Sequence, residues 1–471
     1  MSGSAKLARG RLAGLENVAQ TIGTMGPTAT LGTILPLLMA KSGNASWALG
    51  LAILGIFIAI SSCVCVFAGV RTSAGSLGTY ARMGLGRWPG ILGGWSYALA
   101  MTFVAGSSAV SCAYYLTLVA AHFTHAPVGP LAGLLLVAAV VAFAWWPAYR
   151  DIRLSARLML TAEVISVAAI VFILWAAMSR GGHWVDRPQL KLEGADFGHI
   201  RSGFVLAFMI LAGFESATAL GEESRDATRV LPRVMLGCLL PTGLLFVVGI
   251  YCLGALSHAR SLALDQTTAP FDVIAQSVGL PSLGWMSSLG VALSCYGCAL
   301  GGFNAGSRML YALARSGQLW RPLRAVHPHN GTPYRALGLL AALSFAVPAV
   351  LLLGGVHLDD AMDYLMQIAS FGFLGAYFLV CLAAPLYLAR RKKLHPAAAA
   401  AAAIALVAIG ATWVLSVYPL PDPPWRYLPL VFVALLLAGA LATVSSIRRR
   451  RAASAAREDN PKSEFVVSRS G

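Results

Sequence analysis

Twelve apolar segments recur along the whole chain, and they limit its possible folds more than any other feature. A helix of about 20 apolar residues crosses the roughly 30 Å hydrocarbon core of a bilayer. The segments are uniformly apolar rather than alternating, which is typical of membrane helices and not of barrel strands. The sequence therefore predicts an all-α polytopic membrane protein with 12 transmembrane helices. Their approximate ranges are 13–40, 46–70, 88–122, 127–147, 154–179, 199–221, 233–257, 282–313, 335–354, 360–389, 396–418 and 427–446.

The composition leaves too few polar residues for a separate soluble domain. Only 11% of the 471 residues are charged, whereas soluble domains carry about 25%. The longest predicted external loop, 180–199, has only 20 residues. We therefore predict one transmembrane domain over 1–447. A basic and then polar tail over 448–471 is expected to be disordered in the cytoplasm.

The placement of Lys and Arg predicts how the chain is oriented in the membrane. Basic residues concentrate on the cytoplasmic side of membrane proteins, so we expect both termini in the cytoplasm and the protein in the plasma (inner) membrane. No small-residue cleavage site precedes the first helix, so we expect no signal peptide. The excess of Lys and Arg on the cytoplasmic side also explains the net charge of +16, so no nucleic-acid partner is needed to account for it. In this orientation only seven of the 35 basic residues lie outside: Lys41, Arg180, Arg187, Lys191, Arg201, Arg260 and Arg426.

Two of the predicted helices are interrupted by small residues. The first contains TIGTMGPTAT at 21–30, and the sixth contains LAGFES at 211–216. Gly and Pro weaken or remove helical hydrogen bonds, and the freed backbone groups at membrane depth must face a ligand, water or other protein. The two helices are five apart, as a five-plus-five inverted repeat over about 12–180 and 199–390 requires, with two extra helices at 396–446. Two unrelated packing kinks are the alternative.

Two acidic residues lie deep inside predicted helices. Glu215 precedes Glu222 by seven residues, about 10 Å of helix, and Glu163 follows Arg153 by ten, about 15 Å. A charge at the bilayer centre costs about 3 kcal/mol or more. Glu215 can be protonated, which makes it a candidate proton site, or it can be a structural carboxylate that joins the two interrupted helices. For Glu163 a proton site, a sodium ligand and a structural role all stay open.

Four separated stretches, in order, resemble the amino acid–polyamine–organocation permeases. The resemblance covers most of 12–390 and implies a LeuT-like fold with discontinuous helices 1 and 6 and no cofactor. Many family members have Lys where Glu163 stands, which leaves the coupling ion open. The stretches are GLENVAQTIGTMGP at 14–27, SLGTYARMGLGRWPGILGGW at 76–95, AGFESATALGEESRDATRVLPRVM at 212–235 and GSRMLYALARSGQLWRPLRAVHPHNGTPYRAL at 306–337.

The resemblance implies a substrate site between the two interruptions. An amino acid's carboxylate would meet backbone N–H groups at the positive end of the second half-helix, whereas Pro27 has no N–H to donate. Carbonyls of the sixth helix would accept the substrate's ammonium group, and the apolar side chains of Phe208, Leu211 and Phe214 favour substrates with neutral or apolar side chains. The predicted substrate-binding residues are Thr24, Met25, Gly26, Thr28, Ala100, Met101, Phe208, Ile210, Leu211, Ala212, Phe303 and Asn304, with Ser370 and Phe371 as further cavity residues.

The resemblance also implies a coupling site and a gate. Glu163 would carry a proton or bind Na⁺ together with hydroxyls such as Ser294 or Ser307. On the cytoplasmic side, Arg308 is expected to pair with Glu222, Glu223 or Asp226. Tyr80 lies in an inner loop that is expected to contribute to the same gate.

The prediction is a secondary active transporter of amino acids or related amines that works by alternating access, with proton symport favoured. An exchanger and a non-transporting amino acid sensor are the alternatives. An enzyme is not expected, because the nine histidines lie in loops or at helix ends and no HExxH, nucleophile elbow or GxxxxGK[ST] motif occurs. Cys295 and Cys298 have CxxC spacing but are interpreted as packing thiols. The expected partners are a small molecule, the bilayer and a proton or Na⁺, with the protein as a monomer or homodimer.

Overall fold

The computed structural model describes residues 7, 10–125, 128–181 and 184–458, with side chains up to residue 449. Every regular element in these ranges is helical, and one isolated bridge joins Leu12 to Ser224. The predicted all-α architecture is therefore confirmed. The predicted tail is helical as far as Glu458, because the last helix continues to that residue. Residues 459–471, the rest of the predicted disordered tail, lie outside the described residues.

Eleven segments of the described chain are long and apolar enough to cross a membrane. The first, Gly14–Ala68, has 55 residues and contains α1 (Gly14–Met25), α2 (Pro27–Ser42) and α3 (Ser46–Ala68). One crossing needs about 20 residues, so this segment is long enough for two. The count of twelve and the inverted repeat stay predictions. The other segments contain α5 (Arg87–Thr124), α6 (Pro130–Arg150), α7 (Ile152–Ser179), α9 (Phe197–Ala207), α10 (Ala227–Arg260), α12 (Pro281–Arg315), α13 (Tyr334–Leu353), α14 (Leu358–Arg390), α15 (Pro396–Leu415) and α16 (Leu428–Glu458).

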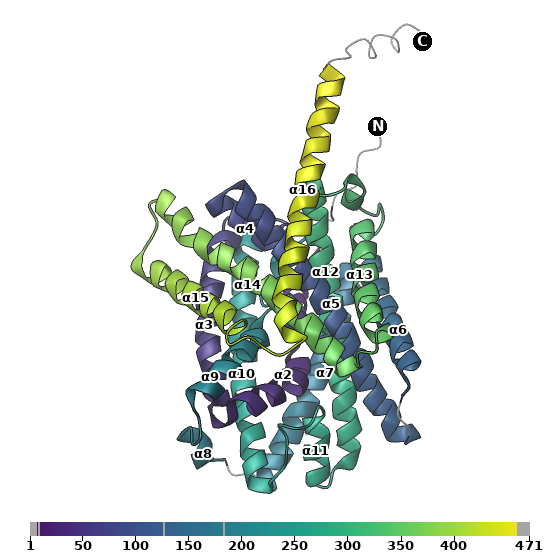
Figure 1. Cartoon of the computed structure of the whole chain (residues 1–471), viewed down its shortest axis with the longest axis vertical. Coiled ribbons are helices and arrows are strands. Elements are labelled where there is room, and N and C mark those ends of the chain that lie inside the picture. The colour runs from purple at the N-terminus through teal and green to yellow at the C-terminus, as the bar shows by residue number, and fades with distance from the viewer. Residues whose placement is uncertain (1–6, 8–9, 126–127, 182–183, 459–471) are drawn as a thin grey trace.

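Short helices mark the two ends of the bundle (Figure 1). α4 (Ser76–Leu85) lies at the upper end in this view, which we call the α4 face. α8 (Arg187–Leu190) and α11 (Pro270–Ser277) lie at the lower end, which we call the α11 face. The remaining described elements are short 3₁₀ turns: η1 (Gly43–Ala45), η2 (Phe208–Leu211), η3 (Ser216–Leu220), η4 (Arg321–Arg324) and η5 (Trp425–Tyr427).

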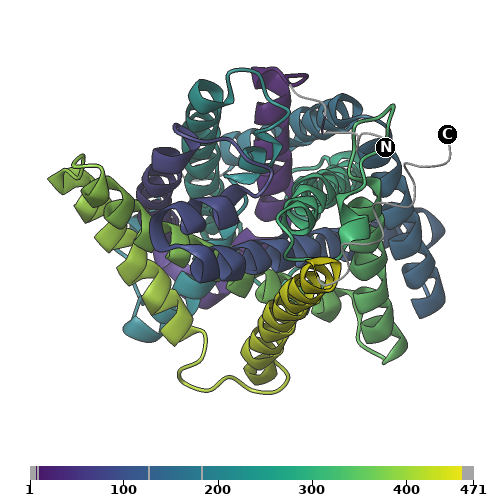
Figure 2. The same cartoon turned by 90° about the horizontal axis from the view of Figure 1, so that it is seen from above.

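The helices differ in how deeply they lie within the bundle. In Phe197–Leu220, the segment with the second interruption, 78% of the most apolar stretch is buried. In Pro396–Leu415 the corresponding share is 28%, and in Trp425–Arg449 it is 17%. Figure 2 shows these last two helices, α15 and α16, at the outside of the bundle. The interrupted segment is therefore central, and the last two helices leave most of their apolar side chains partly or fully exposed at the outside of the bundle.

The first interruption lies between α1 and α2. Gly26 has φ of 51° and ψ of 66°, a left-handed conformation that ends α1, and Pro27 starts α2 at a position where helices tolerate proline. A Cβ atom at Gly26 would lie 2.2 Å from the Cys298 sulfur. Both the backbone and the close contact with α12 therefore require glycine here.

The second interruption follows η2. Ala212 has an extended ψ of 145°, and Gly213 has φ of 93°. A Cβ atom at Gly213 would lie 3.0 Å from Cγ2 of Thr24. The two predicted interruptions are thus present, and they lie against each other.

Candidate substrate site

A small cavity of about 50 Å³ lies where the two interruptions meet. α5 contributes Val104, Ser108 and Ser111, and the second interruption contributes Met209 and Ala212. The other walls come from α1 and α2 (Thr24, Met25, Ala29, Thr30, Thr33 and Ile34), from α12 (Cys295 and Cys298) and from α14 (Met366 and Phe373). Among the described residues, no charged side chain lines this cavity.

A second space of about 60 Å³ continues from this cavity. The two share wall residues such as Thr33, Ser111 and Met209. The second space also reaches Asp363 in the first turns of α14 and Trp425 of η5. The central cavity thus extends in one direction through a narrow space with one acidic residue in its wall.

Several predicted wall residues do line the cavity, namely Thr24, Met25 and Ala212. Ala100 and Met101 of α5 do not: a Cβ at Gly372 of α14 would lie 2.9 Å from the Cβ of Ala100, and one at Gly306 of α12 would lie 3.1 Å from that of Met101. These two side chains pack between helices. The cavity wall of α5 begins one turn later, at Val104.

Several predicted wall residues on the sixth, eighth and tenth helices also lie outside the cavity wall. Phe208 packs against Phe57 at 5.0 Å between ring centroids, and Ile210 and Leu211 are buried away from the cavity. Phe371 stacks on Trp413 of α15 at 5.1 Å, while Ser370 and Phe303 are also buried elsewhere. Met209 and Phe373 occupy the cavity-facing positions instead. The proposed role of the main-chain carbonyls at Ile210, Leu211 and Ala212 stays a prediction.

The N-terminus of α2 has its hydrogen bonds filled from within the protein. The Thr28 N–H donates to Oε1 of Glu163 at 2.7 Å, and the Ala29 N–H donates to the Ser294 hydroxyl at 2.9 Å. That hydroxyl donates to the other Glu163 oxygen at 2.6 Å. The resemblance predicts that the Thr28 N–H meets a substrate carboxylate, whereas in the structure it donates to Glu163.

The remaining donors near this break are also paired. The Thr30 N–H donates to the Gly26 carbonyl at 2.8 Å, and the Gly26 N–H donates to the Ile22 carbonyl at 2.9 Å. Pro27 has no N–H. A substrate carboxylate can therefore use the backbone of this break only if these hydrogen bonds rearrange.

Ser307 does not join Glu163 and Ser294 in a common ion site. It follows Ser294 by 13 residues on α12, about 20 Å of helical rise, and its hydroxyl donates to the Asn304 carbonyl. Within the described ranges, no group of three or more His, Cys, Asp and Glu side chains could hold a metal ion. A sodium ion bound by Glu163 and Ser307 together, as the sequence analysis allowed, does not fit this geometry.

Asn304 lies in a polar cluster outside the cavity. Its side-chain amide donates to Gln20 Oε1 at 3.2 Å and to the Ser155 hydroxyl at 3.0 Å. Gln20 in turn donates to the Gly301 carbonyl at 3.0 Å. Asn304 therefore connects α12 to α1 and α7 and does not line the cavity wall.

Glu215 is fully buried just after the second interruption. Tyr377 of α14 donates its hydroxyl to Oε2 of Glu215 at 2.5 Å and accepts the Gly213 N–H at 3.2 Å. Oε1 of Glu215 and the hydroxyl of Tyr97 have no hydrogen-bond partner in the part of the chain that the structure describes. Tyr377 thus joins Glu215 to the backbone of the second interruption.

Two ion pairs lie between the cavity and the α4 face. Nε and Nη2 of Arg308 donate to the two oxygens of Glu223 at 2.5 and 3.1 Å, with the side chains only 1% and 2% exposed. Arg315 forms a similar two-bond pair with Glu222 nearer the surface. The structure thus selects Glu223 from the three predicted partners of Arg308. Tyr80 is buried and stacks on Phe67 at 5.7 Å between ring centroids.

Some site residues were not anticipated from the sequence. Ser108 and Ser111 stand in GSSAVS at 106–111, a polar run within an apolar helix, and this run is the signal that could have revealed them. Tyr377 lies 162 residues from Glu215 along the chain. No local pattern links these two residues, so their contact could not be read from the sequence.

Comparison with known proteins agrees with this architecture. The family model described as "Amino acid permease" matches residues 15–457. The chain is 27% identical over 349 residues to an uncharacterized transporter of Mycobacterium tuberculosis (strain ATCC 25618 / H37Rv), which covers 72% of this chain and 74% of the relative. It is 25% identical over 355 residues to the branched-chain amino acid permease BcaP of Bacillus subtilis (strain 168), and this match covers 70% of this chain and 72% of the relative. It is also 22% identical over 406 residues to the methylthioribose transporter of the same strain, covering 80% of each chain.

The family match extends over nearly the whole chain and includes both interrupted segments. The relatives described above are transporters, and the structure has the long apolar helices that a multi-pass membrane protein needs. The protein therefore belongs to the amino acid permease family of the amino acid–polyamine–organocation superfamily.

Proposed function

We propose that this permease carries amino acids with neutral, apolar side chains across the plasma membrane by alternating access, in symport with a proton. The observation that carries the substrate class is the cavity between the interruptions, which is lined by hydrocarbon, thioether, thiol and hydroxyl groups. An anionic side chain would be buried there without a charged partner, and a cationic one would find a partner only by reaching Asp363 in the adjoining space. Burial of an unpaired charge is costly. The branched-chain substrate in the name of one relative agrees with this choice.

The cavity must open before it can hold such a substrate. Its 50 Å³ compares with roughly 300 Å³ or more for pockets that bind small molecules. The ion pair between Arg308 and Glu223 lies between this cavity and the α4 face. We propose that this is a closed state, and that breaking the pair gives access from the α4 face, which we place in the cytoplasm together with both termini.

The two buried acids are proposed to have different roles. Both oxygens of Glu163 accept hydrogen bonds, one of them from the N-terminus of α2. Such bonds and the positive end of a helix stabilise a carboxylate, so Glu163 acts as an ionised cap of α2. Glu215 has one oxygen without a partner in the described structure, and it serves as the proton site in this proposal.

Transport assays in proteoliposomes test the proposal and its alternatives. We expect leucine to enter empty vesicles when the proton concentration is higher outside, and arginine to enter much more slowly. Uptake only into vesicles preloaded with amino acid would indicate an exchanger. Binding of leucine without any uptake or counterflow would indicate a sensor, and conversion of the amino acid to a product would indicate an enzyme.

A further inference from the structure

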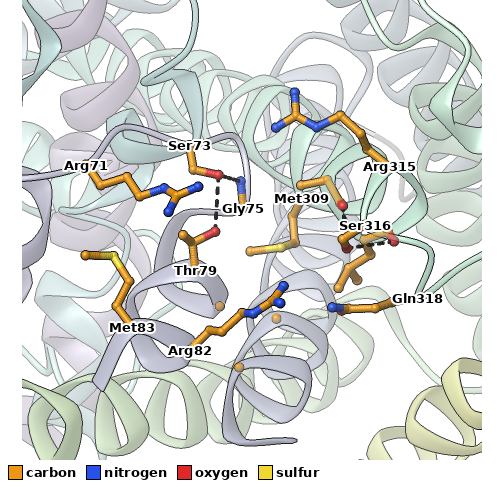
Figure 3. A pocket seen from close by; sticks show the side chains of 15 residues that line it. Arg71, Ser73, Gly75, Thr79, Arg82, Met83, Met309, Arg315, Ser316 and Gln318 are labelled. Atoms are coloured by element: carbon orange, nitrogen blue, oxygen red, sulfur yellow. Dashed lines mark hydrogen bonds between the residues drawn. The ribbon is translucent and has the colours of Figure 1, made fainter. Parts of the chain in front are cut away.

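A larger cavity of about 480 Å³ opens on the α4 face, between α4, α5 and the end of α12 (Figure 3). It shares no lining residue with the central cavity. Three arginines line it: Arg71 comes from the segment before α4, Arg82 from α4 and Arg315 from α12. We call this cavity the arginine pocket.

The arginine pocket has an excess of positive charge. No acidic residue is among its lining residues in the described chain. Arg315 pairs with Glu222 in a neighbouring hollow that Arg71 and Arg315 also line. Arg71 and Arg82 make no ion pair with any residue that the structure describes. Figure 3 shows these two side chains extending into the hollow from different sides. Like charges facing one cavity repel each other, and an anion between them would remove this cost.

The floor of the arginine pocket is polar and closely packed. It carries the hydroxyls of Ser73, Thr79 and Ser316 and the amide of Gln318. A Cβ at Gly78 of α4 would lie 2.7 Å from the backbone of Gly94 of α5, so glycine lets these two helices approach closely beneath the hollow. Guanidinium groups with nearby hydroxyl and amide donors match the oxygens of a phosphate group.

The position of the pocket also suits a group at the membrane surface. Ser446 of α16, a helix at the outside of the bundle, donates its hydroxyl to the carbonyl of Gly317 beside the pocket. α16 then continues through the basic run 448–451. Basic pockets between membrane helices are typical binding sites for phosphate-containing lipid headgroups.

We infer that the arginine pocket binds a phosphate group, carried either by an anionic lipid or by a soluble compound. Arg71 and Arg82 hold the phosphate oxygens. The Ser73 hydroxyl, which only accepts hydrogen bonds within the described chain, and the Gln318 amide supply further donors. Arg315 stands between this site and Glu222. The inference concerns a second site and does not depend on which substrate the central cavity carries.

Binding measurements on the purified full-length chain separate the two sources of phosphate. One arm titrates inorganic phosphate against chloride at equal ionic strength. The other arm compares nanodiscs of phosphatidylcholine with and without phosphatidylglycerol, and native mass spectrometry counts the retained anionic lipid. We expect the double variant R71Q/R82Q to bind either inorganic phosphate or phosphatidylglycerol at least tenfold more weakly than the unchanged protein. The arm that shows this loss identifies the source of the phosphate group.

The chain offers a matched control for this variant. Arg229 and Arg233 are exposed in the first turns of α10 and do not line the arginine pocket. The affinity of the variant R229Q/R233Q for the same ligand should therefore lie within about twofold of that of the unchanged protein. R82K should fall between the two, because it keeps the charge but loses the planar pair of donors.

Protection from arginine modification tests the same site without any substitution. Phosphate or phosphatidylglycerol should slow the reaction of phenylglyoxal with Arg71 and Arg82 and leave Arg229 unaffected, as read by peptide mass spectrometry. The inference is overturned if neither ligand binds, or if binding falls equally in both double variants. Equal protection of all three arginines would also overturn it and would indicate general charge attraction.

Discussion

Gly26 is the residue on which the first interruption depends. Its positive φ is unfavourable for any residue with a side chain, at about 1–3 kcal/mol, and a Cβ there would collide with the Cys298 sulfur. We expect Gly26→Ala to lower the midpoint of thermal unfolding by several degrees and to abolish uptake. Gly14→Ala is the matched control, because a Cβ at Gly14 meets nothing within 4 Å. Equal unfolding midpoints for the two variants would contradict this account of the break.

Glu163 and Glu215 are both buried glutamates, but their surroundings predict different results for the same substitution. Glu215→Gln keeps an oxygen that accepts the Tyr377 hydroxyl and can no longer bind a proton as a carboxylate does. We expect leucine uptake to continue and to lose its stimulation by an inward proton gradient. The measurement is the initial uptake rate with and without the gradient, and undiminished stimulation would rule out Glu215 as the proton site.

Glu163→Gln serves as the counterpart. The amide offers one accepting oxygen where the carboxylate offers two, so we expect a loss of about 1–3 kcal/mol in stability. Uptake that remains should still respond to the proton gradient. If Glu163→Gln loses the response to the proton gradient and Glu215→Gln keeps it, then Glu163 and not Glu215 is the proton site.

At the scale of the helical elements, one buried ion pair, Arg308–Glu223, lies near the α4 face, where we propose that the closed state is held. Glu223→Gln leaves Arg308 buried without its charged partner, which costs about 3–5 kcal/mol. Glu222→Gln affects a pair whose side chains are 45% and 13% exposed, and its oxygen can still accept the Ala74 N–H. Exposed ion pairs contribute about 0–1 kcal/mol, so we expect a smaller loss than for Glu223→Gln. Thermal unfolding of the two variants should therefore differ clearly. Equal losses would show that burial of the Arg308 pair does not matter for stability.

The sequence predicts well where the helices lie along the chain, but it predicts poorly which side of each helix faces the cavity. Long apolar runs and Gly/Pro interruptions are local signals, so most of the helices and both breaks could be located. A helix that is apolar on every side has no periodic pattern to show which side meets a cavity. For this reason Ala100 and Phe371 were predicted as wall residues, whereas Val104 and Phe373 line the cavity.

Rare charges were easier to place than apolar side chains. The resemblance limits the partner of Arg308 to Glu222, Glu223 or Asp226, and the structure pairs it with Glu223. The contacts of Glu163 with Thr28 and of Glu215 with Tyr377 join residues 135 and 162 positions apart. These contacts follow from the packing of the whole bundle and not from any local pattern.

At the scale of the whole molecule, the central cavity and the arginine pocket lie in different parts of the bundle. The first is enclosed and uncharged, and the second is larger, polar and basic. Arg315 links the second cavity to the residues near the closure through Glu222. The molecule therefore combines an uncharged cavity at the two helix breaks with a basic cavity at one end.

Labelling of cavity cysteines tests the central claim most directly. Cys295 and Cys298 line the cavity, whereas Cys238 of α10 does not. The protein is treated with a small maleimide in proteoliposomes, with and without leucine, and labelling of each cysteine is read by peptide mass spectrometry. The account predicts that leucine slows labelling of Cys298 and leaves Cys238 unchanged, while arginine has no effect. Labelling of Cys298 that is the same with and without leucine, in protein that transports leucine, would contradict it.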